Sequence, residues 1–167
     1  MKKLFGKKFL AALVLLLGMG TAKTFAVTGI GLQTGYDVGG GFPLAVTFKV
    51  QQVPCVFAAN FGLGSGYFSV GATADWWIAN PKIDGSWRWF YALGAAAGVS
   101  IFNNAGLALN IAPRAVIGTN YFINGSWEIY AQAAWQPTLG IVLSDGGSGG
   151  GFNLFYIPAN ICFRYWF

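Results

Sequence analysis

The feature that most constrains this chain is a period of two in its apolar residues over residues 155–167. The opposite face of this segment includes the polar residues Asn160 and Arg164. Successive residues of a β-strand point to opposite faces, so a long alternation of this kind predicts a strand with lipid on one side and a polar lumen on the other. The apolar face consists of Phe155, Ile157, Ala159, Ile161, Phe163, Tyr165 and Phe167.

The same alternation recurs upstream, separated by turn dipeptides such as Asn124-Gly125 and Asp84-Gly85. It predicts an all-β fold, a closed antiparallel eight-stranded transmembrane β-barrel with both ends of the barrel segment on the same side. A single long strand through residues 62–67 is the alternative, and it would give seven strands. The predicted strands are residues 30–36, 44–50, 55–63, 68–77, 87–101, 107–117, 127–139 and 155–167.

The composition favours a surface that meets lipid. Hydrophobic residues make up 55% of the chain and charged residues only 9%, far fewer charges than a water-facing surface needs. Trp87, Trp127 and Trp135 are predicted membrane-interface aromatics, and the last two lie roughly 20 Å apart along the membrane normal, close to the spacing of two aromatic girdles. A helical span over residues 89–117 is the alternative, but Asn, Pro, Arg and many Gly residues interrupt it.

The first residues predict a secretory signal peptide. Lys2, Lys3, Lys7 and Lys8 precede a short apolar run, and small residues suit cleavage after Ala26. An uncleaved membrane anchor is the alternative, although the run is short for a spanning helix. We therefore expect a signal peptide over residues 1–26 and a barrel over residues 27–167. The barrel then holds five basic and five acidic residues, so its net charge is zero and a nucleic-acid partner is not expected.

The chain lacks histidine, and Asp75 with Glu128 is the one carboxylate pair that could be considered for catalysis. The chain has no His, which removes His-activated nucleophiles and the commonest metal ligand, so we expect neither an enzyme nor a cofactor or metal site. The charged residues on the predicted inner faces form a structural polar network in a lumen that side chains fill, because an eight-stranded barrel has room for little else. These residues are Lys49, Asp75, Arg88, Arg114, Glu128 and Arg164.

Two further motifs receive structural interpretations. The Gly-rich run at residues 146–151 lacks the Lys that a phosphate-binding loop needs, so it predicts a flexible surface loop. Cys55 and Cys162 fall on predicted strands that are not neighbours, with Cys55 facing outward and Cys162 inward. We therefore expect two free thiols rather than a disulfide.

With this signal peptide, these strands and the final residues 163–167, the chain resembles small outer-membrane barrels typified by the OmpA transmembrane domain, OmpX and OmpW. Its Gly- and Phe-rich composition also resembles that of small barrels of spirochaetes. The resemblance implies that Phe163, Tyr165 and Phe167 form a C-terminal signal for the barrel-assembly machinery. It also implies residence in the bacterial outer membrane, among outer-membrane lipids.

Two functions remain open. The first is a structural or surface-interaction role, in which short extracellular loops at residues 37–43, 64–66, 102–106 and 144–151 contact a host or cell-surface ligand. The second is an OmpW-like conduit for small apolar molecules that uses the lumen aromatics Trp77, Phe90 and Tyr130. Fold alone does not choose between them.

Overall fold

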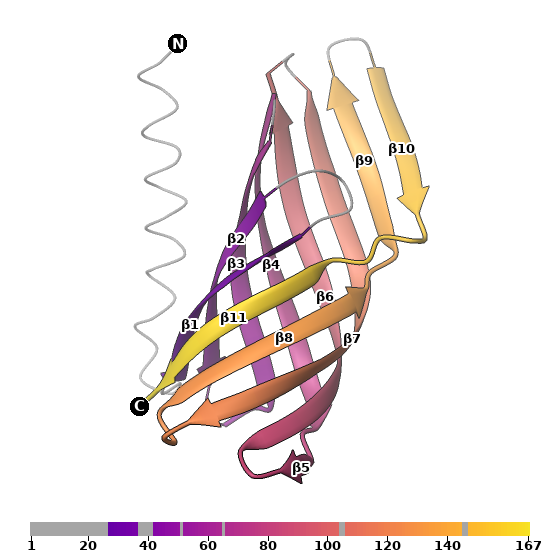
Figure 1. Ribbon diagram of the computed structural model, residues 1–167. Coiled ribbons are helices and arrows are strands. Elements are labelled where there is room, and N and C mark those ends of the chain that lie inside the picture. The colour runs from indigo at the N-terminus through magenta and orange to yellow at the C-terminus, as the bar shows by residue number, and fades with distance from the viewer. Residues whose placement is uncertain (1–26, 37–41, 51, 65, 104–105, 145–146) are drawn as a thin grey trace, which may run out of the picture.

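The structure is a computed structural model that describes residues 27–36, 42–50, 52–64, 66–103, 106–144 and 147–167 (Figure 1). The predicted signal peptide lies outside these residues. All regular elements among them are β-strands, and they form one antiparallel sheet. The strands are β1 (Val27–Tyr36), β2 (Phe42–Val50), β3 (Cys55–Gly64), β4 (Tyr67–Ala79), β5 (Lys82–Asp84), β6 (Trp87–Phe102), β7 (Leu107–Ile123), β8 (Trp127–Trp135), β9 (Thr138–Ser144), β10 (Gly147–Asn153) and β11 (Ala159–Trp166).

Eight of these strands close into a ring, in the order β1, β2, β3, β4, β6, β7, β8, β11. The ring closes where β11 pairs with β1, from Gly29 opposite Trp166 to Tyr36 opposite Ala159. Closure pairs the backbone groups of both edges, which is the requirement for a sheet in an apolar medium. The predicted closed eight-stranded antiparallel barrel is therefore confirmed.

Both ends of the described barrel lie at one end of the ring, as predicted. The Phe167 backbone N–H donates to the Thr28 carbonyl at 2.9 Å. We call this end, with Val27 and Phe167, the terminal end, and we call the opposite end, with Gly64 and Phe102, the open end. At the terminal end Asn124 and Gly125 both have positive φ, 48° and 81°, a conformation that Asn and Gly tolerate best.

The segment over residues 62–67 contains a turn rather than one long strand. Strands β3 and β4 pair as a hairpin up to Gly64 opposite Tyr67. Gly66 in the turn has φ 87°, which favours glycine. The eight-stranded interpretation therefore holds, and the seven-stranded alternative is excluded.

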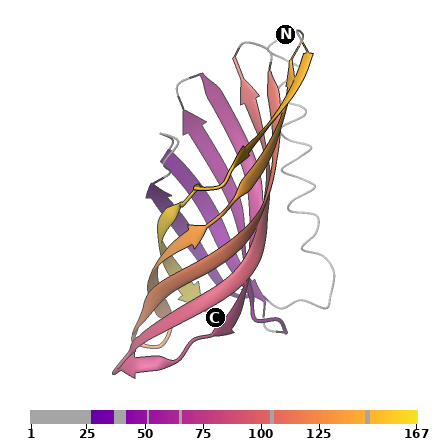
Figure 2. The same cartoon turned by 90° about the vertical axis from the view of Figure 1, so that its right-hand side faces the viewer.

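Strand β10 corrects the prediction of a Gly-rich surface loop over residues 144–151. Residues 147–153 pair along their whole length with β9, from Gly147 opposite Ser144 to Asn153 opposite Thr138. Glycine weakens a strand because it has no side chain to pack, but its peptide group pairs normally. The β9–β10 hairpin projects from the ring at the open end, where β9 pairs with β7 (Figures 1 and 2).

Two predicted strands are shorter than the alternation suggested. The prediction over residues 127–139 breaks between Trp135 and Thr138, and residues 154–158 separate β10 from β11. Pro137 and Pro158 lie in these breaks and have no N–H to donate to a ladder. A backbone hydrogen bond still connects the two interrupted segments: the Gln136 N–H donates to the Tyr156 carbonyl at 2.9 Å.

Candidate functional site

Alternating burial on β8 separates an outer face from the lumen. Glu128, Tyr130, Gln132 and Ala134 are buried, whereas large apolar residues between them are exposed. The exposed set includes the three predicted interface tryptophans, Trp87, Trp127 and Trp135, which are 49%, 37% and 48% exposed. All three side chains are thus exposed rather than packed in the lumen.

The predicted C-terminal signal residues form an aromatic cluster on the outer face at the terminal end. The ring of Trp127 stacks on Phe163 with centroids 4.7 Å apart, and it contacts Tyr165 at the same distance. Tyr165 in turn meets Phe167 edge to face at 5.3 Å. Adjacent strands β8 and β11 therefore present one continuous aromatic surface.

A buried ion pair joins the neighbouring strands β8 and β11 inside the lumen, near the terminal end. Arg164 Nη1 donates to Glu128 Oε2 at 3.0 Å, and both side chains are completely buried. Glu128 also accepts hydrogen bonds from Asn120 Nδ2 at 2.6 Å and Trp166 Nε1 at 3.0 Å. The carboxylate is thus well satisfied, whereas Arg164 has one ionic partner and no hydrogen bond from Nε or Nη2 to the described residues.

Aromatic rings cover the rest of the Arg164 guanidinium. Its Cζ atom lies 4.6 Å from the Tyr130 ring centroid and 5.9 Å from that of Trp77. Trp77 stacks on Phe90 with centroids 4.0 Å apart, and the Tyr130 hydroxyl donates to Gln33 Oε1 at 3.0 Å. Cation–π contacts of this kind stabilise a desolvated guanidinium. The three lumen aromatics pack against one another, and Trp77 and Tyr130 also contact Arg164, so they line no open path.

The residues just described fill the terminal half of the lumen, and we call them the lumen plug. They come from opposite sides of the ring, so side chains bridge its full width. Glycine allows the tightest of these contacts, because a Cβ at Gly118 would collide with the Phe90 ring. The members of the plug are Gln33, Trp77, Phe90, Asn120, Glu128, Tyr130, Cys162 and Arg164.

A second buried ion pair lies above the plug toward the open end. Arg114 makes a two-pronged contact with Asp75, through Nε to Oδ1 at 2.8 Å and Nη2 to Oδ2 at 3.2 Å. Arg114 Nη1 also donates to Gln136 Oε1. This fork geometry is the strong form of an Arg–carboxylate interaction.

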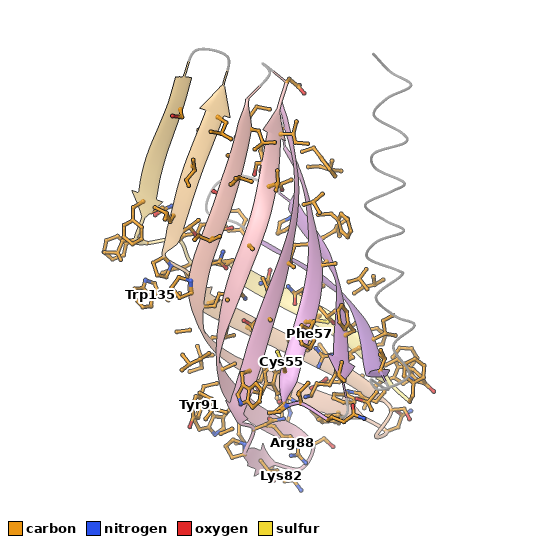
Figure 3. All side chains as sticks on the ribbon, turned by 180° about the vertical axis from the view of Figure 1, so that it is seen from behind. Cys55, Phe57, Lys82, Arg88, Tyr91 and Trp135 are labelled. Atoms are coloured by element: carbon orange, nitrogen blue, oxygen red, sulfur yellow. The ribbon has the colours of Figure 1, made fainter. Side chains whose placement is uncertain are left out.

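Lys49 and Arg88 do not join either ion pair. Lys49 Nζ donates to the Val53 carbonyl at 2.5 Å. Arg88 Nη1 lies 3.5 Å from the Asn80 carbonyl, and its Cζ atom lies 5.7 Å from the Phe122 ring centroid. Figure 3 shows Arg88 near Lys82 and β5, at the terminal end. The six charged residues predicted as one network are thus two separate pairs and two side chains that bind backbone carbonyls.

Replacing Asp75 with asparagine is expected to lower the free energy of unfolding by about 1–3 kcal/mol. The change removes the charge that balances Arg114, which is only 5% exposed, but it leaves the Gln136 contact. The measurement is the urea midpoint of the refolded barrel, with Asp84→Asn on the exposed strand β5 as the control. Equal midpoints for the two variants would contradict this role of the ion pair.

Beyond Arg114 the lumen contains a cavity of about 600 Å³, which we call the open-end cavity. The prediction of a lumen filled throughout by side chains is therefore wrong for this half of the barrel. The reason is the size of the inward residues, because Gly71, Ala96, Gly98, Ala112 and Gly140 leave space unfilled. Sequence patterning identified Gly71, Ala96, Gly98 and Ala112 as inward but did not account for their small volume.

Other chemistry is limited in the described part of the chain. Cys55 and Cys162 are buried free thiols on β3 and β11, which are not neighbours in the ring. No group of three or more His, Cys, Asp or Glu residues that could hold a metal ion occurs within the described ranges. Those ranges also contain no helix long and apolar enough to cross a membrane.

Comparisons with known proteins give distant structural similarities. No protein-family model matches the chain, and no curated protein matches it significantly. The crystal structure of Neisserial surface protein A is similar with a TM-score of 0.44 and 10% identity, over 86% of this chain and 96% of that one. A major outer membrane protein from Thermus thermophilus has a TM-score of 0.44 and 11% identity, over 84% of this chain and 98% of that one. Similarities this weak assign no function to the chain.

Proposed function

We propose that this protein is an integral protein of a bacterial outer membrane, with a structural or surface-interaction role and no catalytic activity. The observation that carries the proposal is the outer face of the closed ring. Large apolar side chains are exposed on it strand after strand, among them Leu32, Leu93, Ile111 and Ile117, each more than half exposed. An apolar patch of this extent marks contact with a membrane or partner.

Lipid is the partner that best fits an apolar face on all sides of a barrel. The ring has no open edge at the seam between β1 and β11, so its backbone is satisfied without water. The aromatic cluster of Trp127, Phe163, Tyr165 and Phe167 supplies interface residues at the terminal end. We assign the terminal end to the periplasm and the open end to the exterior, and the aromatic cluster to recognition by the assembly machinery.

The lumen plug favours a barrel that seals the membrane over a conduit for small apolar molecules. Phe90 and Tyr130 are buried almost completely; Tyr130 lies against the Arg164 guanidinium, and Phe90 packs edge to face on Tyr130. A solute that crossed the lumen would have to displace this buried charge pair. Any surface interaction would therefore use the open end, where the described part of the predicted loops includes Gly66, Asn103 and Gly106.

The test of the proposal is solute flux through the protein reconstituted in liposomes. We expect swelling in small sugars, and leakage of a small apolar dye, to equal those of protein-free liposomes. The matched comparison is the variant Phe90→Ala, which should open the plug and raise leakage if the protein is inserted. Rapid flux through the wild-type protein would overturn the sealed-barrel proposal in favour of the conduit.

A further inference from the structure

The open-end cavity is a candidate binding site that differs from the lumen plug. Its volume of about 600 Å³ falls within the range of roughly 300–1,000 Å³ that small-molecule sites occupy. Its walls come from strands on both sides of the barrel, including β3, β4, β6, β7 and β10. Its floor is the Arg114 side chain with Gln136.

Side-chain amides line this cavity and give it a specific chemistry. These amides say more about the ligand than the small residues do, because a cavity lined only by Gly and Ala would discriminate little between ligands. An amide offers donors and acceptors together, which suits ligand groups that also do both. The lining amides are Gln33, Asn60, Asn110, Gln136, Asn153 and Asn160.

Part of this hydrogen-bonding capacity is unused. The side chains of Asn110 and Asn160 make no hydrogen bond to the residues that the structure describes. Gln33 is only 7% exposed, and its oxygen accepts from Tyr130, but its amide nitrogen donates to no described group. Asn110 and Asn160 are half-buried, and all three amides line the cavity, so their unused donors and acceptors suit a ligand with hydroxyl or amide groups.

The charge of the cavity excludes a strongly ionic ligand. Arg114 is the only Asp, Glu, Lys or Arg among the lining residues in the described ranges, and Asp75 neutralises it through two contacts. A bound anion would compete with Asp75, and a bound cation would meet Arg114. The cavity therefore suits an uncharged polar molecule.

Aromatic rings and a free strand edge complete the mouth of the cavity. Tyr67 and Phe102 lie together there, with ring centroids 6.1 Å apart. Strand β10, which contributes Gly151 and Asn153 to the lining, pairs only with β9 among the described strands. Its other edge offers further backbone donors and acceptors, and the rings offer flat apolar faces.

We propose that the open-end cavity binds an uncharged, hydroxyl-rich ligand of the carbohydrate class. Six amides with open hydrogen-bonding positions match the paired hydroxyls of a sugar, and the aromatic faces at the mouth match its C–H surface. The ligand is a free glycan or the sugar headgroup of a glycolipid, because both present the same chemistry. An acyl chain alone would leave the amides unpaired, at a cost for each buried group.

The test is binding of the full chain, purified in an amine-oxide detergent without sugar, to an array of neutral and acidic glycans. We expect saturable binding to neutral glycans. The variant Ala96→Phe places a ring in the cavity and should weaken binding about tenfold or more, equivalent to at least about 1.4 kcal/mol. The matched control is Ala95→Phe, the preceding residue on β6, whose side chain is exposed on the outer face and should leave affinity unchanged.

A second variant tests the amides without filling the cavity. Asn110→Leu keeps the approximate volume, removes one unused amide and should also weaken binding about tenfold. A retained boiling-dependent gel shift shows that each variant is folded, so loss of the site is separable from loss of the barrel. Binding to the free glycan supports a soluble source. Binding to dodecyl maltoside, without binding to the free disaccharide of its headgroup, supports a glycolipid headgroup.

Three results would overturn the proposal. The first is no saturable binding to any neutral glycan by the folded protein. The second is equal weakening by Ala96→Phe and Ala95→Phe, which would place the ligand outside the cavity. The third is tighter binding to acidic than to neutral glycans. None of these results would affect the sealed-barrel proposal, which depends on the plug and the outer face.

Discussion

Replacement of Glu128 by alanine is expected to lower the free energy of unfolding of the barrel by about 3–5 kcal/mol. Glu128 is the one carboxylate that contacts Arg164, and both side chains are fully buried. Removal of the carboxylate leaves the buried Arg164 guanidinium with aromatic contacts but no ionic partner among the described residues. It also leaves the side-chain N–H groups of Asn120 and Trp166 without their acceptor. The measurement is the urea midpoint in detergent, followed by tryptophan fluorescence and by the folded band on an unboiled gel.

Two further variants make this prediction specific. Asp84→Ala removes a carboxylate from the exposed strand β5 and should leave the midpoint within experimental error. Glu128→Gln removes the charge but keeps one acceptor oxygen, enough for either Asn120 or Trp166, so its loss should be intermediate. A Glu128→Ala loss below about 1 kcal/mol, the scale of an exposed ion pair, would contradict the role assigned to the lumen plug.

An arginine in place of Ile117 is expected to cost about 2–4 kcal/mol when the protein folds into lipid bilayers. Ile117 is 60% exposed, and the register pairs it with Ala133, between Trp127 and Trp135 on β8. An arginine there would place a charge in the hydrocarbon region. The measurement is folding in vesicles at a series of urea concentrations, read from the folded band.

Ile83→Arg is the matched control for the lipid-facing charge. Ile83 is 62% exposed, but it belongs to β5, which lies outside the ring and pairs only with β6. The same substitution there should change stability little, because the charge stays in water. Similar losses at Ile83 and Ile117, or no loss at either, would show that the outer face of the ring does not meet lipid.

The fold was predictable because an apolar outer face and a more polar inner face impose one period on every ring strand. On β8 the alternation of Glu128 and Tyr130 with Trp127 and Ile129 assigned each side chain to its observed face. The Asn124-Gly125 dipeptide also predicted its turn correctly, since both residues adopt positive φ. These features are local, so they can be recognised within a few residues of sequence.

The departures arise where the outcome depends on backbone hydrogen bonding rather than on the side-chain pattern. The Gly-rich strand β10 has no side-chain pattern, and it forms because β9 offers a backbone ladder. Pro137 and Pro158 interrupt strands whose apolar alternation continues past them. Periodicity describes side chains, so it does not detect either effect.

The candidate sites were predictable in composition but not in arrangement. The inner-face charges were correctly identified, but their division into Asp75–Arg114 and Glu128–Arg164 depends on barrel geometry. The open-end cavity was missed for a similar reason. Its signal was present as Gly and Ala at inward positions of β4, β6 and β7, and summing the volumes of those residues would have revealed the space.

The measurement that tests the central proposal most directly is gel mobility of the protein from isolated outer membranes, run boiled and unboiled, with far-UV circular dichroism on the same purified sample. A closed barrel in that membrane predicts enrichment in the outer-membrane fraction, a band that shifts on boiling, and a β-strand spectrum. Recovery in the inner-membrane or soluble fraction, a band indifferent to boiling, or a helical spectrum would contradict the proposal.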